Sequence, residues 1–249
     1  MPVTASPLRF PGGKAKYAKF FEKIIELNNF DNMIFVEPFA GGAGAAMTLL
    51  LEGIVREVIL NDIDPKIYAF WYSLLNNSAE FLELLRTTPI SVPEWRKQKR
   101  KFNSSESILE LGFATFYLNR CNRGGILAAN PIGGINQNSK YMISARFNKP
   151  NLERKIRRII DLKESITLFN KDALDFMNDL KSNYSGRELL IYLDPPYIRK
   201  GKLLYYNHYN EKNHIDLRAT ISQCPFPWVL SYDSHPLIFR IYKEHKIRT

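Results

Sequence analysis

Short apolar runs of strand length recur in the first and last parts of the chain. They lie at residues 33–37, 57–61, 165–169, 188–194 and 227–233. Each run is bounded by turn residues or by a helical pattern, as expected of parallel strands that helices cover on both faces. The pattern therefore predicts an α/β fold with a doubly wound, Rossmann-like sheet.

The middle of the chain follows a helical pattern instead. Residues 65–164 contain no run that alternates as a strand does, and we predict a long amphipathic helix over residues 65–86. Further helices are predicted at 106–120 and 150–165, with a Gly/Asn-rich loop between them. We therefore predict that residues 1–64 and 165–249 form one α/β domain, and that residues 65–164 form a helical domain inserted after its second strand.

Positive charge is concentrated in this middle part. The chain has a net charge of +10, and residues 81–170 alone hold 16 basic against 7 acidic side chains. A basic block of this kind favours a polyanionic partner, because binding to phosphates releases condensed counterions. The alternative interpretation is a solvated, lysine-rich helical face.

Composition excludes several classes of protein. Cys121 and Cys224 are the only cysteines, so a disulfide framework and a cysteine-based zinc site are excluded, as is usual in a reducing compartment. The four histidines do not recur at the spacing of a helical metal site. No apolar run reaches the ~20 residues of a membrane span, and the first residues lack the apolar core of a signal peptide. We expect a cytoplasmic protein without a metal.

A glycine-rich turn follows the first predicted strand. In VEPFAGGAGAAM, at residues 36–47, the strand runs into Gly41, Gly42 and Gly44 and then into a helix, whose N–H groups face a ligand. Asp62 follows the second strand, where a carboxylate can accept both hydroxyls of a ribose. The two segments predict a nucleoside cofactor, either a dinucleotide or S-adenosylmethionine. Alternatively, Asp62 is the N-cap of the helix that begins at Pro65.

The fourth strand ends in the sequence Asp194, Pro195, Pro196 and Tyr197. Two prolines cannot continue a strand, so the plainest interpretation is a turn. The arrangement also supplies a particular chemistry, because the Asp194 carboxylate and the Pro195 carbonyl can both accept hydrogen bonds from an exocyclic amine. Its nitrogen lone pair then stays available to attack an electrophilic methyl group. Tyr197 can stack on a base that has been flipped out of a duplex.

Five segments in this order resemble Dam-like, class D12 DNA adenine-N6 methyltransferases over about residues 6–235. They are RFPGGK, VEPFAGGAG, LNDID, FYLNR and DPPY. The resemblance implies a seven-stranded methyltransferase sheet, S-adenosylmethionine as the methyl donor, double-stranded DNA as the substrate and the insertion as a target-recognition domain. Carried over residue by residue, it implies that the donor is bound by Phe10, Lys14, Glu37, Pro38, Phe39, Gly41, Asp62 and Asp194, and that Asp194 also holds the target amine.

Basic and polar residues of the insertion are candidates for DNA contacts. They are Arg96, Lys97, Arg100, Asn119, Arg120 and Arg123. Relatives that read GATC resemble YGYNGLCR after LNR, whereas this chain has CNRGGILA, so we do not carry that specificity over. The family also continues with two further antiparallel strands, for which this chain leaves no room before Thr249. The fifth strand would then be an exposed apolar edge.

Other functions explain less of the sequence. An amine methyltransferase acting on RNA or on a protein glutamine would share the fold, although the glutamine enzymes typically resemble NPPY rather than DPPY. A catalytically inactive DNA-binding remnant would explain the short C-terminus. An NAD-dependent oxidoreductase would explain only the glycine turn and Asp62. We therefore predict a DNA adenine-N6 methyltransferase, acting as a monomer or weak dimer.

Overall fold

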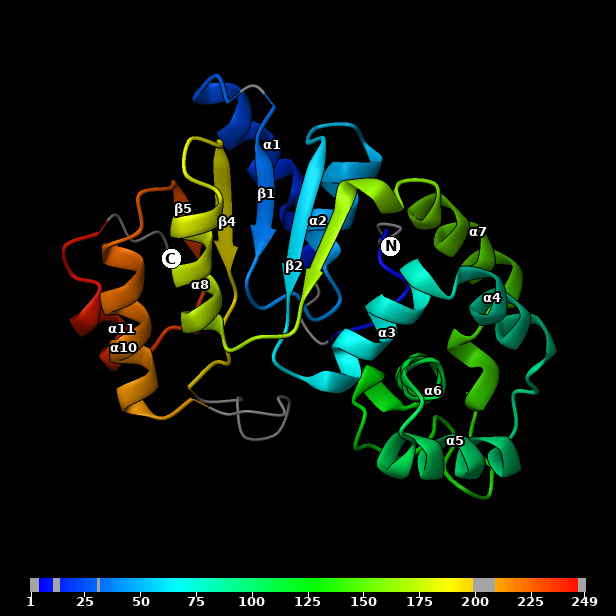
Figure 1. Ribbon diagram of the computed structural model, residues 1–249. Helices are drawn as coiled ribbons and strands as arrows, with labels where there is room; N and C mark the ends of the chain where they lie inside the picture. Colours follow the sequence, from blue (N-terminus) through cyan, green and yellow to red (C-terminus); the bar gives the residue numbers. More distant parts are fainter. Residues whose placement is uncertain (1–4, 11–13, 31, 199–208, 246–249) are drawn as a thin grey trace.

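A single parallel sheet forms the centre of the molecule (Figure 1). The computed structural model describes residues 5–10, 14–30, 32–198 and 209–245. In these ranges the strands lie in the order β3-β2-β1-β4-β5, and all four pairings are parallel. All five predicted strands are confirmed, although the fifth is shorter than predicted. They are β1 (Ile34–Glu37), β2 (Glu57–Asn61), β3 (Ile166–Phe169), β4 (Leu189–Leu193) and β5 (Trp228–Leu230).

The strand order reverses between β1 and β4. From β1 the chain continues outward to β2 and β3, and it then returns to the other side of β1 to form β4 and β5. Val36 of β1 is level with both Ile59 and Ile191, so the three central strands end at the same edge. In open α/β sheets, ligands bind in the crevice that such a reversal opens at the carboxyl ends.

Side chains of the strands alternate between two apolar layers, as the pleat of a strand requires. Phe35, Leu60 and Tyr192 belong to the layer that is covered by α1 (Ala18–Leu27) and α2 (Gly44–Leu51). Their neighbours along the strands face the opposite layer, which is covered by α8 (Ala173–Asn183), α10 (Glu211–Ser222) and α11 (Pro236–Ile241). The two-sided covering explains why the inner positions of β1, β2 and β4 are apolar.

The helical region between β2 and β3 is present as predicted, but one of its helices differs. The helix predicted over residues 65–86 is two helices that meet at Asn77, which ends the first and precedes the second. Asn77 has a φ of −118° and a ψ of 42°, which are not helical angles, so the helix is interrupted at this residue. The apolar spacing is unbroken there, so it does not reveal the bend. The helices of the region are α3 (Pro65–Asn76), α4 (Ser78–Thr87), α5 (Val92–Ser104), α6 (Ile108–Cys121) and α7 (Lys149–Ile160).

Close packing joins this helical region to the sheet. A Cβ atom at Gly112 of α6 would lie 2.3 Å from the carbonyl oxygen of Ala69, so only glycine lets α6 approach α3 this closely. Phe70 and Phe116 stack across the same contact, with ring centroids 6.0 Å apart. Both rings belong to the apolar layer that contains Phe35 of the sheet. The insertion therefore shares one core with a face of the sheet.

β5 lies at one edge of the sheet. Its three residues are half-buried, and the Trp228 ring contacts the ring of His245 at a centroid distance of 5.2 Å. Within the part of the chain that the structure describes, the sheet contains no antiparallel pair. None of the helices in the described ranges is long and apolar enough to cross a membrane.

Candidate active site

Three carboxylates gather at the carboxyl edge of the sheet. Glu37 is the last residue of β1, Asp62 follows β2 and Asp194 follows β4. Because β2, β1 and β4 are neighbours, residues that are far apart in sequence meet at the point where the strand order reverses. The structure thus brings together the acidic residues of three of the predicted motifs.

The glycine turn and Asp62 are joined by hydrogen bonds. The backbone N–H of Gly41 donates to Oδ2 of Asp62 at 2.7 Å, and that of Asp64 donates to Oδ1 at 2.9 Å. Gly41 has a φ of 47°, in the left-handed region that favours glycine. Asp64, and not Asp62, is the N-cap of α3 and accepts from the N–H of Lys66. The interpretation of Asp62 as a helix cap is therefore wrong.

Burial changes the acidity of Glu37 and Asp62. Glu37 is 4% exposed, and its burial raises its pKa to about 8 even though the N–H of Ala46 donates to it at 2.8 Å. Asp62 is only partly exposed to solvent, and burial raises its pKa to about 7 against the effect of its two N–H donors. Glu37 is therefore largely neutral at pH 7, and Asp62 titrates near neutrality.

Phe10 packs directly on the glycine turn. A Cβ atom at Gly42 would lie 2.9 Å from the Phe10 ring, and one at Gly44 would lie 3.0 Å from the backbone nitrogen of Ala15. The glycines therefore leave room for the N-terminal segment as well as for a ligand. Pro38 and Phe39 belong to the same turn. The Pro38 carbonyl accepts a hydrogen bond from the Asn61 side chain at 3.0 Å.

Asp194 is the centre of a second hydrogen-bonded cluster. Its Oδ1 atom accepts from Lys14 Nζ at 2.7 Å, from the Tyr197 hydroxyl at 2.9 Å and from Ser231 Oγ at 2.6 Å. Burial alone would lower the pKa of Lys14, but the Asp194 carboxylate and Tyr197 outweigh it and raise that pKa. The Lys14 ammonium also lies 4.9 Å from the centroid of the Tyr197 ring. Pro195 and Pro196 follow Asp194 in the chain and are buried.

Ser231 was not among the predicted site residues. It lies directly after β5, and its backbone N–H donates to the Leu193 carbonyl at 2.9 Å, which extends the β4–β5 pairing. Only the adjacency of β4 and β5 places it next to Asp194. A serine after an apolar run is too common in sequences to single it out.

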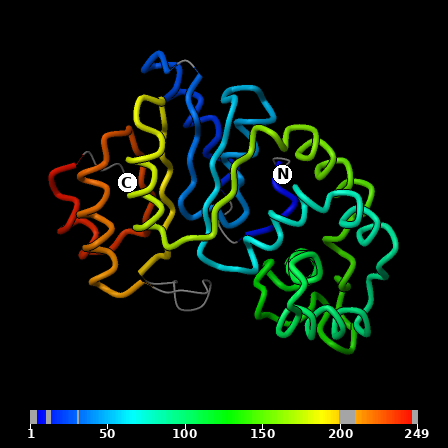
Figure 2. The backbone as a smooth tube through the Cα atoms, in the orientation of Figure 1, coloured from blue at the N-terminus to red at the C-terminus, as the bar shows by residue number. Residues whose placement is uncertain are grey.

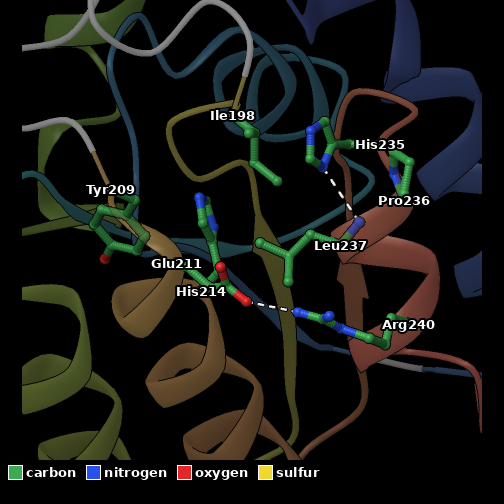
Figure 3. Close-up of a pocket in the computed structure, with 8 residues that line it drawn as sticks. All are labelled: Ile198, Tyr209, Glu211, His214, His235, Pro236, Leu237 and Arg240. Carbon is green, nitrogen blue, oxygen red and sulfur yellow. Dashed lines mark hydrogen bonds and ion pairs between the residues drawn. The ribbon is translucent and has the colours of Figure 1, made fainter.

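A pocket of about 440 Å³ (Figure 3) is lined in part by Ile198, the residue that follows Tyr197. The imidazole of His214 lies between Tyr209 and Leu237 in this view, and Glu211 and Arg240 form an ion pair of 2.5 Å nearby. His214 is 1% exposed, and burial lowers its pKa. Its Nδ1 atom is 2.8 Å from the Tyr232 hydroxyl. In the described ranges, no group of three or more histidine, cysteine or acidic side chains could hold a metal ion. The pocket is lined by Ile198, Tyr209, Glu211, His214, His235, Pro236, Leu237 and Arg240.

The residues predicted to contact DNA fall into two groups. Arg96, Lys97 and Arg100 are exposed on α5, and Arg123 is exposed in the turn that follows α6. Asn119 corrects the prediction, because its side chain is fully buried and cannot reach DNA. It accepts from the N–H of Arg9 at 2.7 Å and donates to the carbonyls of Arg9 and Gly125. Its role is to fix the N-terminal segment to α6.

The N-terminal segment passes the inserted helical region (Figure 2). Arginines of the two parts contact each other's main chain there. Arg9 and Arg120 donate to main-chain carbonyls, including those of Asn122, Pro7 and Arg146. Burial, then the charges of Arg9 and Arg146, lower the pKa of Arg120 to about 10. Among the described residues, no carboxylate forms an ion pair with Arg9, Arg120 or Arg146. We call these three residues the arginine cluster.

Comparisons with known proteins agree with this arrangement of motifs. The Type II methyltransferase M.MjaIII of Methanocaldococcus jannaschii is 22% identical to this chain over 225 residues, which cover 84% of this chain and 74% of that protein. The family model of the D12 class N6 adenine-specific DNA methyltransferases matches residues 10–249. That stretch spans the glycine turn, Asp62 and the cluster around Asp194. The chain therefore belongs to the D12 class N6 adenine-specific DNA methyltransferase family.

Proposed function

We propose that this protein transfers a methyl group from S-adenosylmethionine to the N6 amine of an adenine that is flipped out of double-stranded DNA. The observation that carries the proposal is the position of Asp194 and Pro195 at the reversal of the strand order, beside the glycine turn and Asp62. One edge of the sheet thus holds a nucleoside site and an amine site together.

The residues around the glycine turn fit the methyl donor. Each Asp62 oxygen accepts one backbone N–H and keeps a lone pair, so the carboxylate can accept the two hydroxyls of a ribose. Phe10 packs on the glycine turn that bonds to Asp62, Pro38 and Phe39 belong to the same turn, and Lys14 donates to Asp194. When bound, S-adenosylmethionine supplies an electrophilic methyl group.

Asp194 and Pro195 orient the acceptor amine. The Asp194 carboxylate accepts one N–H of the amine and the Pro195 carbonyl accepts the other, so the nitrogen lone pair points at the methyl carbon. Transfer of the methyl group from the donor's sulfur would give the nitrogen a positive charge. The Asp194 carboxylate would stabilise this charge until the nitrogen lost a proton to solvent. No covalent intermediate with the protein is needed, and burial raises the pKa of the Cys121 thiol to about 12.

The insertion provides the surface for DNA. Among the described residues no carboxylate pairs with the arginine cluster, and a cluster of unpaired cations favours phosphodiesters. Arg96, Lys97, Arg100 and Arg123 extend the positive surface along α5 and the turn after α6. Contacts to phosphates fix the position of the duplex, and base contacts then select the sequence.

The test is a transfer assay with labelled S-adenosylmethionine and duplex DNA of mixed sequence. The DNA is digested to nucleosides, and we expect the label in N6-methyladenine. The Asp194→Ala variant should lose transfer but still retain DNA. RNA and a glutamine-bearing protein are included as competing acceptors. Label in either of these but not in DNA would contradict the proposal, as would full activity of Asp194→Ala.

A further inference from the structure

The three donors to Oδ1 of Asp194 come from different parts of the molecule. Lys14 belongs to the N-terminal segment, and Tyr197 belongs to the loop that would face the substrate. Ser231 instead belongs to the end of the sheet, where its N–H donates to Leu193. Ser231 is therefore the donor whose position is fixed by the sheet. No described residue donates to Oδ2 of Asp194.

The direction of the Ser231 hydrogen bond can be assigned. A carboxylate only accepts, so the single hydroxyl proton of Ser231 points to Asp194. The Ser231 oxygen must then accept from the Tyr192 hydroxyl, which lies 3.1 Å away. Tyr192 is 2% exposed, and burial followed by the Asp194 charge raises its pKa far above the ordinary value, so it keeps its proton. Its ring packs against Phe21 at a centroid distance of 4.7 Å.

We propose that Ser231 and Tyr192 are positioning residues, which hold Oδ1 of Asp194 through a chain of two hydrogen bonds and leave Oδ2 to accept the substrate amine. The inference rests on the proposed function, because the amine is the group that Oδ2 receives. Lys14 and Tyr197 lie on the substrate side and can change partners when substrates bind. The chain from Tyr192 to Ser231 is anchored in the core and keeps the carboxylate in one orientation.

Each substitution has a distinct expected effect. Ser231→Ala removes a hydrogen bond to a charged group, and we expect kcat to fall on the order of 10- to 100-fold. The KM for DNA and the affinity for the donor should stay within about twofold, because neither substrate touches Ser231. Tyr192→Phe removes only the outer hydroxyl, and we expect a loss of kcat of roughly 2- to 10-fold. Ser231→Thr keeps the hydroxyl and should restore most of the activity.

A double-mutant cycle separates positioning from a general loss of packing. If Tyr192 acts through Ser231, then Tyr192→Phe should have no further effect in the Ser231→Ala background. The matched control is Tyr242→Phe, which removes a phenol oxygen that is equally buried but has no partner among the described residues. This control should leave kcat unchanged. Thermal melting of every variant checks that the fold is kept.

Failure of this inference can be distinguished from failure of the proposed function. The wild-type assay first identifies the acceptor, and the ratios between variants are then measured on that acceptor. Additive effects in the cycle, or a Ser231→Ala variant with normal kcat, would overturn the positioning role. A crystal structure of Ser231→Ala gives an answer without any activity. We expect the Asp194 carboxylate to turn away from β5, and an unmoved carboxylate would also overturn the inference.

Discussion

The Lys14 ammonium lies 2.7 Å from Oδ1 of Asp194, although 180 residues separate the two in sequence. Their side chains are 16% and 15% exposed, so the pair is shielded from most of the solvent. The contact holds the N-terminal segment against the carboxyl end of β4. It also links the donor side of the site, at the glycine turn, to the amine side. The charge of Lys14 should therefore matter for both substrates.

Replacing Lys14 with glutamine should impair transfer without unfolding the protein. The change removes the cation from Asp194, and we expect kcat/KM to fall by at least about 10-fold, as for a lost charge-assisted hydrogen bond. Lys14→Arg should not restore activity, because a planar guanidinium cannot replace a compact ammonium in this space. Lys16→Gln, at an exposed position in the same turn, is the control. Equal activity of Lys14→Gln and Lys16→Gln would contradict the role of the pair.

The strands could be predicted because each is a local apolar run with clear ends. The helical insertion could be predicted for the same reason, but not the bend at Asn77, where the apolar spacing continues through a backbone junction. The role of Asp62 could not be predicted from its neighbours either, because it depends on the N–H of Gly41, 21 residues away. Local pattern therefore predicts elements better than it predicts their junctions.

The site shows the same division between local and distant information. Asp194 and Tyr197 could be identified because the residues that suggest their chemistry are four consecutive positions of the chain. Ser231 could not, because its importance arises from a strand pairing. The sequence neighbours of Asn119 favour a DNA contact, whereas its side chain is buried and bonds to Arg9, 110 residues away. The role of a residue that acts through a partner distant in sequence cannot be predicted from the residues around it.

Glu37 should make the protein less stable as the pH rises. Its pKa is raised from 4.5 to about 8 in the folded state, so its destabilising effect is absent below about pH 4.5 and grows as the pH rises toward 8. Glu37→Gln removes this effect and keeps an acceptor for the Ala46 N–H. We expect urea unfolding to show a gain on the order of 3 kcal/mol at pH 7.5 relative to pH 5. The same gain at both pH values would contradict the raised pKa.

Asp62 should make binding of the methyl donor depend on pH. Ribose hydroxyls donate more strongly to a carboxylate than to a carboxylic acid, and the pKa of Asp62 is about 7. Calorimetry should therefore show that the dissociation constant of S-adenosylmethionine falls between pH 5.5 and 7.5, with a limiting slope of about tenfold per pH unit at the acid end. Asp62→Asn should bind weakly at every pH. A slope that persists in Asp62→Asn would assign the titration to another group.

Asn119 should matter for stability and not for DNA affinity. Asn119→Ala leaves the N–H of Arg9 and the carbonyl of Gly125 buried without this partner, and we expect a loss on the order of 2–4 kcal/mol. Asn151→Ala, at an exposed position of α7, should change stability by less than about 0.5 kcal/mol. At temperatures where both variants are folded, their affinities for duplex DNA should be similar. A selective loss of DNA affinity in Asn119→Ala that persists in an Arg9→Gln background would restore the surface role.

The arginine cluster should bind a phosphodiester of DNA. In the free protein, its three positive charges repel one another. Arg146 is exposed, and its charge lowers the pKa of both Arg9 and Arg120, in each case after the effect of burial. Arg146→Gln should therefore leave the melting temperature unchanged or raise it, while it weakens DNA binding. In a plot of log Kobs against log salt concentration, the slope should become shallower by about 0.9, which corresponds to one lost phosphate contact. The control is Arg56→Gln, which changes an exposed arginine just before the amino end of β2. It should leave that slope unaltered. Equal slopes for the wild type and Arg146→Gln would show that DNA does not reach the cluster.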